Sequence, residues 1–292
     1  MKLHELIGNT ALVELQNIPP GKGVKIFGKL EGDNPGGSVK DRTAYGMIRG
    51  ALDRGEIKPG DKLVEATSGN TGIALAMMAR IMGLDMTLIM PDNSTPERVL
   101  AMEAYGARVI LTPSAQTIEY SRSLAEQMAS KEGYHILNQF ANTDNSKIHY
   151  QTTGPEIWRD TGGTITHFVS AMGTTGTIMG VSRYLKEQNK NVRIIGTQPT
   201  EGSCIPGIRR WSPEFLPKIF EKERVDRILD VSEKEARIFT KRLAKEEGIL
   251  AGMSSGGALS AAVKIASELE QGIIVFIICD RGDRYLSSDL FT

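Results

Sequence analysis

Residues 63–90 read LVEATSGNTGIALAMMARIMGLDMTLIM and contain the pattern that recurs along most of the chain. Residues 63–66 and 86–90 are short apolar runs of the length of buried strands, and a segment of helical periodicity separates them. Further apolar runs that alternate with helical segments lie at 108–111, 167–170, 192–195 and 273–279. This alternation is typical of βαβ units with a parallel sheet, so it predicts an α/β fold.

Turn and cap residues predict where some helices begin and end. Thr95 or Ser94 precedes a helix that has proline at its first position and Gly106 after its last. Ser232 and Glu235 have the spacing of a capping box for a helix that runs toward Gly248.

Size and composition are those of a globular protein with room for two lobes. The chain has 292 residues, of which 40% are apolar and 24% charged. The polar segment 139–146 interrupts the periodic pattern near the midpoint. We therefore expect two α/β lobes with open, mostly parallel, twisted sheets, and a ligand in the cleft between them.

Charge and cysteine content argue against several classes of function. The 35 Lys and Arg balance the 35 Asp and Glu without a run of like charge, so neither nucleic acid nor a membrane surface is an expected partner. The longest apolar run, 273–279, is much shorter than a membrane span. Two cysteines, Cys204 and Cys279, and an N-terminus without a signal-peptide pattern predict a cytoplasmic protein. The four histidines lack paired spacing, so no metal site is expected.

Glycine, with 31 residues, is enriched and clusters at junctions between strands and helices. Residues 67–72 (TSGNTG) and 173–177 (GTTGT) follow predicted strands, and 254–257 (SSGG) precede a helix. Glycine lets backbone N–H groups approach a ligand, and the N-terminus of the following helix favours an anion. One such cluster is more often a simple helix cap, but three in one chain favour a phosphate site. There is neither a Walker A loop nor a GxGxxG motif followed by an acidic residue.

A fourth junction, residues 34–42 (NPGGSVKDR), places Lys40 in the first turn of a helix. Ser38 and Asp41 have the spacing of a capping box for this helix. A cation in the first turn opposes the helix dipole by about 0.3–1 kcal/mol, so the position is unfavourable for a purely structural lysine. A solvated side chain is the ordinary alternative. The dipole alone does not make Lys40 a nucleophile, whereas burial or an imine with an aldehyde cofactor would.

Five segments, in this order over nearly the whole chain, resemble the fold type II pyridoxal-phosphate enzymes, and among them the O-acetylserine sulfhydrylases, or cysteine synthases. They are IGNT (7–10), a strand at 29–31 followed by NPGGSVKDR, EATSGNTGIALA (65–76), SAMGTTGTIMG (170–180) and GMSSGGA (252–258), and GDRYLS (282–287) belongs with them. Residues 203–211 (SCIPGIRRW) and 279–284 (CDRGDR) are similar to the B-type members. Cys204 departs from the serine expected there, but it lies outside the cofactor motifs.

The resemblance implies a role for each matching position. Lys40 would hold pyridoxal 5′-phosphate as an internal aldimine and act as the catalytic base. The cofactor phosphate would lie on Gly173, Thr174, Thr175, Gly176 and Thr177. Asn70 would bind the ring hydroxyl and Ser254 the pyridine nitrogen, while Thr67, Ser68, Thr71 and Gln139 would bind the substrate carboxylate. The smaller lobe, 37–145, would carry the asparagine loop, and the larger lobe, 1–36 with 146–292, the phosphate loop.

The reaction that the resemblance implies is β-replacement in a homodimer. O-acetyl-L-serine would lose acetate to give an α-aminoacrylate, and sulfide would add to form L-cysteine. Arg209 and Arg210 would offer bidentate donors to thiosulfate, which would give S-sulfocysteine. A cysteine synthase that uses O-phosphoserine, a cystathionine synthase and a serine or threonine dehydratase remain alternatives, as does a binding protein that has lost catalysis.

Overall fold

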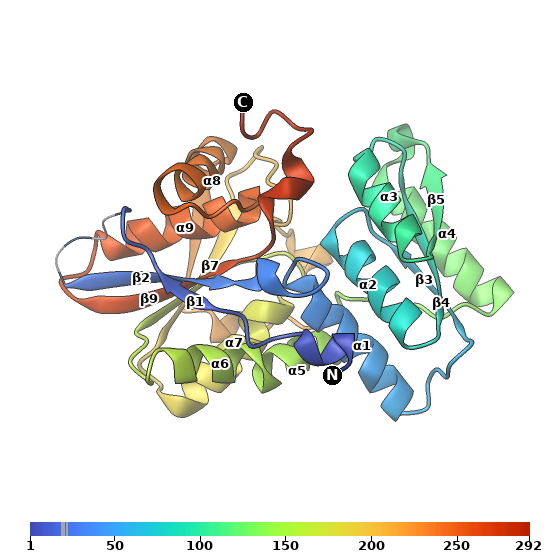
Figure 1. The fold of residues 1–292 in the computed structure, drawn as a ribbon, viewed down its shortest axis with the longest axis horizontal. Coiled ribbons are helices and arrows are strands. Elements are labelled where there is room, and N and C mark those ends of the chain that lie inside the picture. The colour runs from blue at the N-terminus through green and yellow to red at the C-terminus, as the bar shows by residue number, and fades with distance from the viewer. Residues whose placement is uncertain (19–20, 22) are drawn as a thin grey trace.

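The computed structural model describes residues 1–18, 21 and 23–292, and two sheets carry the fold in this part of the chain (Figure 1). The larger sheet has the order β1-β2-β9-β6-β7-β8, and all its neighbours are parallel except β1 with β2. Its strands are β1 (Leu12–Glu14), β2 (Val24–Leu30), β6 (His167–Ala171), β7 (Arg193–Pro199), β8 (Arg227–Val231) and β9 (Gly272–Ile278). The smaller, all-parallel sheet has β3 (Lys62–Ala66), β4 (Asp85–Pro91) and β5 (Arg108–Thr112).

Helices cover both faces of each sheet (Figure 1). The helices that cover the smaller sheet are α2 (Asn70–Ile81), α3 (Pro96–Ala104) and α4 (Thr117–Glu132). One face of the larger sheet packs on α8 (Glu233–Glu247) and α9 (Met253–Ala266), and the other on α5 (Thr143–Gln151), α6 (Thr153–Asp160) and α7 (Gly176–Gln188). Helix α1 (Lys40–Asp53) lies between the two sheets, against α2 and α5. No helix in the described ranges has both the length and the apolar character to cross a membrane.

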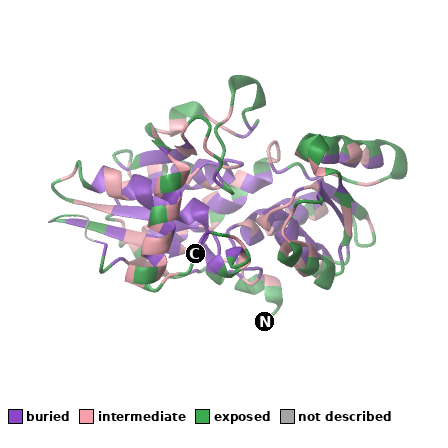
Figure 2. Cartoon of the chain, turned by 90° about the horizontal axis from the view of Figure 1, so that it is seen from above, coloured by how far each residue is buried: buried purple, intermediate pink, exposed green. Residues whose placement is uncertain are grey.

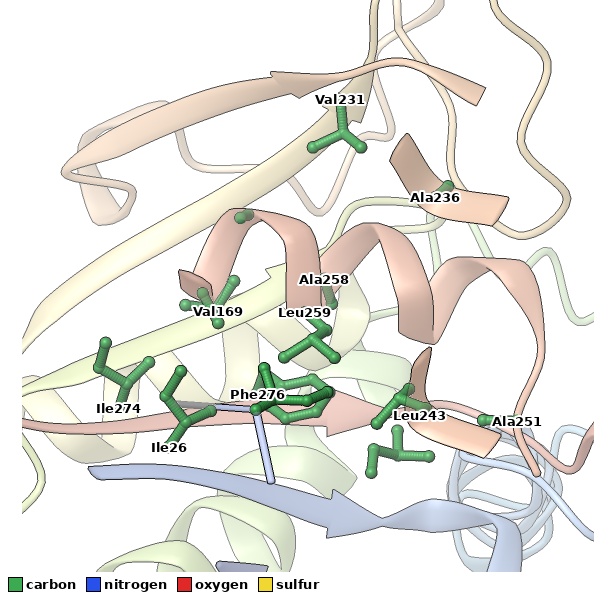
Figure 3. Packing of buried hydrophobic residues seen from close by; sticks show 14 of the residues in the cluster. Ile26, Val169, Val231, Ala236, Leu243, Ala251, Ala258, Leu259, Ile274 and Phe276 are labelled. Atoms are coloured by element: carbon green, nitrogen blue, oxygen red, sulfur yellow. The ribbon is translucent and has the colours of Figure 1, made fainter. Parts of the chain in front are cut away.

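Strand periodicity explains why the sheets are buried on both faces. In β9, Phe276 joins the core beneath α9 (Figure 3), while Val275 and Ile277 join a second core on the opposite face. In β3, Leu63 packs toward α2 and Val64 toward α4 in the same way. Alternate residues of a strand point to opposite faces, so an apolar run makes two cores. Figure 2 shows the buried residues concentrated in the strands and in the helices next to them.

The structure confirms the predicted α/β class and the six predicted strands, with ends that differ by a few residues. Strands β1 and β8 were not predicted, and the strand expected at 29–31 is the end of β2, since Glu31 begins a 3₁₀ turn. The capping box of Ser232 and Glu235 is present, and Gly248 has φ +71°. The boundary predicted between 145 and 146 falls within α5, so one helix crosses it.

The capping box predicted for Ser38 and Asp41 is wrong. Helix α1 begins at Lys40, and the Ser38 hydroxyl accepts a hydrogen bond from the Lys40 N–H at 3.2 Å. The Asp41 carboxylate accepts from the Gly36 N–H instead of the Ser38 N–H. The tight turn at 34–37, in which Gly37 has φ +80°, brings the Gly36 N–H to the Asp41 carboxylate. Gly36 therefore takes the place of the Ser38 N–H as the donor to Asp41.

Candidate active site

A cavity of about 280 Å³ lies between the two sheets, at the carboxyl ends of β3 and β6. The ends of parallel strands meet at one edge of a sheet, so two sheets that face each other there bring loops from distant segments together. Most of the predicted site residues line this cavity: Lys40, Thr67, Ser68, Asn70, Thr71, Gln139, Gly173, Thr174, Thr175, Thr177, Arg209 and Ser254. Gly176 and Arg210 do not line it.

Lys40 begins α1 and reaches the cavity from the junction with the larger sheet. The Val39 N–H donates to the Cys279 carbonyl at 2.8 Å, which places Lys40 beside the end of β9. Burial lowers the pKa of Lys40, although the negative charge of Asp280 acts in the opposite direction. Among the described residues, the Nζ of Lys40 has no hydrogen-bond or ion-pair partner, so it is free to react with a ligand.

Cys279 also lines the cavity, although sequence analysis assigned it no role. Burial raises the pKa of its thiol to about 11, and the neighbouring Asp280 adds to this effect. A hydrogen bond with Ser254, in the first turn of α9, acts against it. Cys279 is therefore a neutral thiol at ordinary pH and lies beside both Lys40 and Ser254.

The segment 173–177 forms the N-terminal turn of α7. Thr175 has φ +69°, and its hydroxyl oxygen is buried without a hydrogen-bond partner. A Cβ on Gly173 would lie 2.7 Å from the Gly207 carbonyl oxygen, so only glycine fits this close approach. Trp211 holds the turn in place, because its Nε1 donates to the Gly173 carbonyl at 2.8 Å. The turn thus presents a helix N-terminus and an unpaired hydroxyl to the cavity, which is a suitable environment for an anion.

The loop 67–72 joins β3 to α2 and places Asn70 against the C-terminal part of the chain. The Asn70 amide donates to Asp280 at 2.6 Å and accepts from Arg284 at 2.6 Å. Arg284 also donates to the Gly36 carbonyl, and Tyr285 donates to Asp280 at 2.6 Å. The motif GDRYLS, to which the sequence analysis gave no separate role, therefore positions Asn70 through Arg284 and Tyr285. Sequence analysis missed Asp280, because its partner is far away in the chain.

Arginines from three elements surround the mouth of the cavity. Arg98 of α3, Arg122 of α4 and Arg209 all line it, and none of the lining residues is an aspartate or a glutamate. Burial, and then the charge of Arg122, lower the pKa of Arg209. Sequence analysis missed Arg98 and Arg122, which look like ordinary surface residues of amphipathic helices. The cavity is strongly cationic and suits anionic ligands.

Arg210 is directed away from this cavity. Its guanidinium lies 2.5 Å from the Asp230 carboxylate and donates to the Pro199 carbonyl at 2.8 Å. Gly176 packs against Asn145 of α5, where a Cβ would overlap the Asn145 amide. In the described part of the chain, no three His, Cys, Asp or Glu side chains gather as metal ligands.

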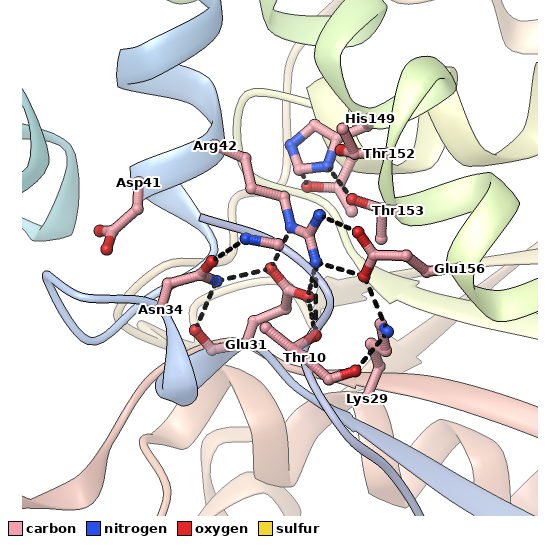
Figure 4. A network of polar contacts seen from close by, with 12 residues as sticks. Thr10, Lys29, Glu31, Asn34, Asp41, Arg42, His149, Thr152, Thr153 and Glu156 are labelled. Carbon is pink, nitrogen blue, oxygen red and sulfur yellow. Dashed lines mark hydrogen bonds and ion pairs between the residues drawn. The ribbon is translucent and has the colours of Figure 1, made fainter. Parts of the chain in front are cut away.

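A buried network of charges supports α1 from behind (Figure 4). Arg42 is completely buried and forms bidentate pairs with Glu31 and Glu156, with N to O distances of 2.6–2.8 Å. Lys29 contacts Glu156 at 2.8 Å, and the Thr10 hydroxyl donates to Glu31 at 2.8 Å. The network joins α1 to β2 and α6, and so fixes the helix that carries Lys40.

Comparison with known proteins identifies the family. Residues 3–280 match the model of the pyridoxal-phosphate dependent enzymes. The chain is 59% identical over 287 residues to cysteine synthase B of Pseudomonas aeruginosa, covering 98% of this chain and 96% of that protein. It is 56% identical to cysteine synthase B of Escherichia coli, covering 99% and 95%.

Solved structures agree with this assignment. Cysteine synthase (OASS) from Entamoeba histolytica superposes with a TM-score of 0.94 at 39% identity, covering 99% of this chain and 90% of that one. An O-ureido-L-serine synthase superposes with a TM-score of 0.94 at 36% identity, covering 99% and 94%. A full-length sequence match, the shared fold and a cationic cavity around a free lysine lead to one conclusion: the chain belongs to the family of pyridoxal-phosphate dependent enzymes.

Proposed function

We propose that this protein is a cysteine synthase that makes L-cysteine from O-acetyl-L-serine and sulfide with pyridoxal phosphate. The observation that carries the proposal is the free Nζ of Lys40 in a cavity formed by an asparagine loop and a phosphate loop. Two relatives that are 56% and 59% identical over nearly the full length are cysteine synthases B, which supports it.

The residues around the cavity fit the cofactor. The buried, unpaired hydroxyl of Thr175 and the close approach of Gly173 to Gly207 form a cradle at the N-terminus of α7, where a phosphate is favourable. Lys40 would hold the cofactor aldehyde, Ser254 the pyridine nitrogen and Asn70 the ring hydroxyl. When bound, the cofactor draws electrons away from the Cα of an attached amino acid. A neutral serine at the pyridine nitrogen, unlike an aspartate, does not hold that nitrogen protonated, which favours β-elimination over transamination.

Lys40 would also act as the base. Burial lowers its pKa, which increases the fraction of neutral amine that is able to take the Cα proton from the substrate. Thr67, Ser68, Thr71 and Gln139 would bind the substrate carboxylate at the start of α2. The Thr71 hydroxyl donates to the Gln139 amide oxygen at 2.8 Å, so the Gln139 amide nitrogen remains free to donate to that carboxylate.

The donor range would depend on the arginines at the mouth. Arg209 lines the cavity, whereas Arg210 is paired with Asp230, so we assign the thiosulfate contact to Arg209 alone. Thiosulfate has anionic oxygens that a guanidinium can bind, and hydrosulfide has none. Formation of a homodimer and location in the cytoplasm stay predictions, to be tested by light scattering and by cell fractionation.

The test combines a spectrum with an activity screen. Purified protein should be yellow, and its visible absorbance should shift when O-acetylserine is added without a sulfur donor. A screen of O-acetylserine, O-phosphoserine and serine against sulfide, thiosulfate and homocysteine should give the highest kcat/KM for O-acetylserine with sulfide. A preference for O-phosphoserine or homocysteine would assign the protein to one of the alternative activities.

A further inference from the structure

The hydroxyl groups of the phosphate loop are in contact with a buried hydrogen-bond chain on α5. Asn145 and His149 lie one turn apart on this helix and are fully buried. Helix α5 packs closely on α7, since a Cβ on Gly180 would collide with the Ser146 carbonyl and with His149. Neither Asn145 nor His149 lines the cavity, and neither has a role in the function proposed above.

The orientation of the Asn145 amide follows from its partners. One of its two terminal atoms lies 2.7 Å from the Gln139 backbone carbonyl, which only accepts, so this atom is the Nδ2 donor. The same Nδ2 lies 3.2 Å from the Thr174 hydroxyl. The other atom is therefore the Oδ1 acceptor, and the Thr43 hydroxyl donates to it at 3.0 Å.

This orientation decides which nitrogen of His149 carries the proton. Burial, and then the charge of Arg42, lower the pKa of His149 to about 3, so the ring is neutral at ordinary pH. Thr43 has given its only hydrogen to Asn145, so toward His149 it can only accept, at 3.5 Å from Nε2. Only a ring with its proton on Nε2 can hydrogen-bond to Thr43, so this contact favours that tautomer. The unprotonated Nδ1 accepts from the Thr153 hydroxyl, 2.9 Å away (Figure 4).

The hydrogen-bond orientations of His149 and Asn145 affect two threonines that line the cavity. His149 Nε2 is 3.3 Å from the Thr177 hydroxyl, and an N–H there makes the Thr177 oxygen an acceptor. The Thr174 oxygen likewise accepts from Asn145. Each hydroxyl keeps its own hydrogen unused, and both residues line the cavity. A phosphate dianion offers only acceptors, so a loop whose hydroxyls can only donate suits it.

We propose that Asn145 and His149 are positioning residues that hold the Thr174 and Thr177 hydroxyls as hydrogen-bond donors toward a phosphate in the cavity. The proposal rests on the assignment of 173–177 as the phosphate loop. If the ring carried its proton on Nδ1 instead, Thr177 would donate to Nε2 and would turn its hydrogen away from the ligand.

The first test locates the proton directly. In the ¹⁵N spectrum of histidine-labelled apoprotein, the His149 ring should show a protonated Nε2 and a bare Nδ1, with His149→Gln protein used to assign the signals. A protonated Nδ1 would overturn the proposal without affecting the assignment of the phosphate loop.

The second test is a double-mutant cycle on the affinity of the apoprotein for inorganic phosphate and for pyridoxal phosphate. Thr177→Val and His149→Asn should each raise the dissociation constant by about tenfold or more, the effect of one lost hydrogen bond to a charged group. Their combination should be hardly weaker than Thr177→Val alone, because His149 acts through the Thr177 hydroxyl. His149→Gln, whose amide reaches the position of Nε2, should restore most of the affinity.

Each outcome of the cycle is decisive. Additive losses, or an unchanged dissociation constant in His149→Asn, would overturn the proposal and leave the phosphate loop in place. An unchanged constant in Thr177→Val would overturn the loop assignment and the proposal together. Thr153→Val, an isosteric change outside the cavity, serves if His149→Asn does not fold. It removes the donor to Nδ1 and should weaken phosphate binding, and full wild-type affinity would contradict the proposal.

Discussion

Replacement of Arg42 by methionine should strongly destabilise the protein. Methionine fills most of the same space but leaves the Glu31 carboxylate, which is completely buried, without its bidentate partner. Glu156 keeps Lys29 at 2.8 Å, so the main penalty comes from Glu31. Removal of one member of a buried ion pair costs about 3–5 kcal/mol. At about 2–4 °C per kcal/mol for a chain of this size, the melting temperature should fall by roughly 6–20 °C.

The destabilisation should depend on pH. Burial alone would raise the pKa of Glu31, but the charge and hydrogen bonds of Arg42 hold it below its ordinary value of 4.5. In wild type, Glu31 therefore stabilises the fold above that value, and the contribution is lost as the pH falls through the folded pKa. Without Arg42, the burial effect remains and raises the pKa, so Glu31 can become neutral by taking up a proton. The loss in R42M should be larger at about pH 7.5 than at about pH 5.5.

The assay is urea unfolding of the apoprotein, followed by circular dichroism at both pH values. Arg49→Met is the matched control, because Arg49 pairs with Asp53 on the exposed face of the same helix. Solvent screens this exposed pair, so its loss should change the stability little. A loss in R42M below about 1 kcal/mol, or a loss no greater than that of Arg49→Met, would refute the reasoning about the buried network.

Two further predictions concern the site, and a third concerns Glu65, a buried acid in β3. Lys40→Ala should abolish turnover and the borohydride-reducible link to the cofactor, as measured by mass spectrometry, while the cofactor still binds non-covalently; a retained link would contradict the role of Lys40. Arg209→Ala should lower kcat/KM for thiosulfate by about tenfold to a hundredfold and change kcat/KM for sulfide little. Arg210→Ala is the matched control and should affect the two donors equally. Equal losses for both donors in Arg209→Ala would exclude a contact between Arg209 and thiosulfate. Burial raises the pKa of Glu65 to about 7, against hydrogen bonds from the Asn138 and Leu137 N–H groups. A buried acid whose pKa is raised in the folded protein makes the protein less stable as the pH rises above the pKa of that acid in the unfolded chain. Glutamine does not titrate, so the free energy of unfolding of Glu65→Gln relative to wild type should increase by up to roughly 3 kcal/mol between about pH 5 and pH 8. A difference that does not depend on pH would contradict this prediction.

Sequence alone was enough to predict the α/β class, six strands and several helix ends. Apolar periodicity, the Ser232 to Glu235 spacing and glycine at Gly248 are local signals, because they depend on residues within one or two turns of each other. The glycine-rich junctions and Lys40 were found in the same way. The edge strands β1 and β8 escaped notice because they are short and half-exposed, so their apolar pattern is weak.

Only the tertiary structure decided how the site is held. Asn70 and Asp280 are 210 positions apart, and Arg42 and Glu156 are 114 apart, yet each pair is in hydrogen-bond contact. The tertiary structure also brings Arg98 and Arg122, from helices of the smaller sheet, to the mouth of the cavity. It likewise pairs Arg210 with Asp230, so that Arg210 does not face the cavity. A side chain's partner depends on how distant elements pack, and periodicity contains no information about that packing. The sequence therefore determined the elements and the chemical groups, and the fold determined which of those groups meet.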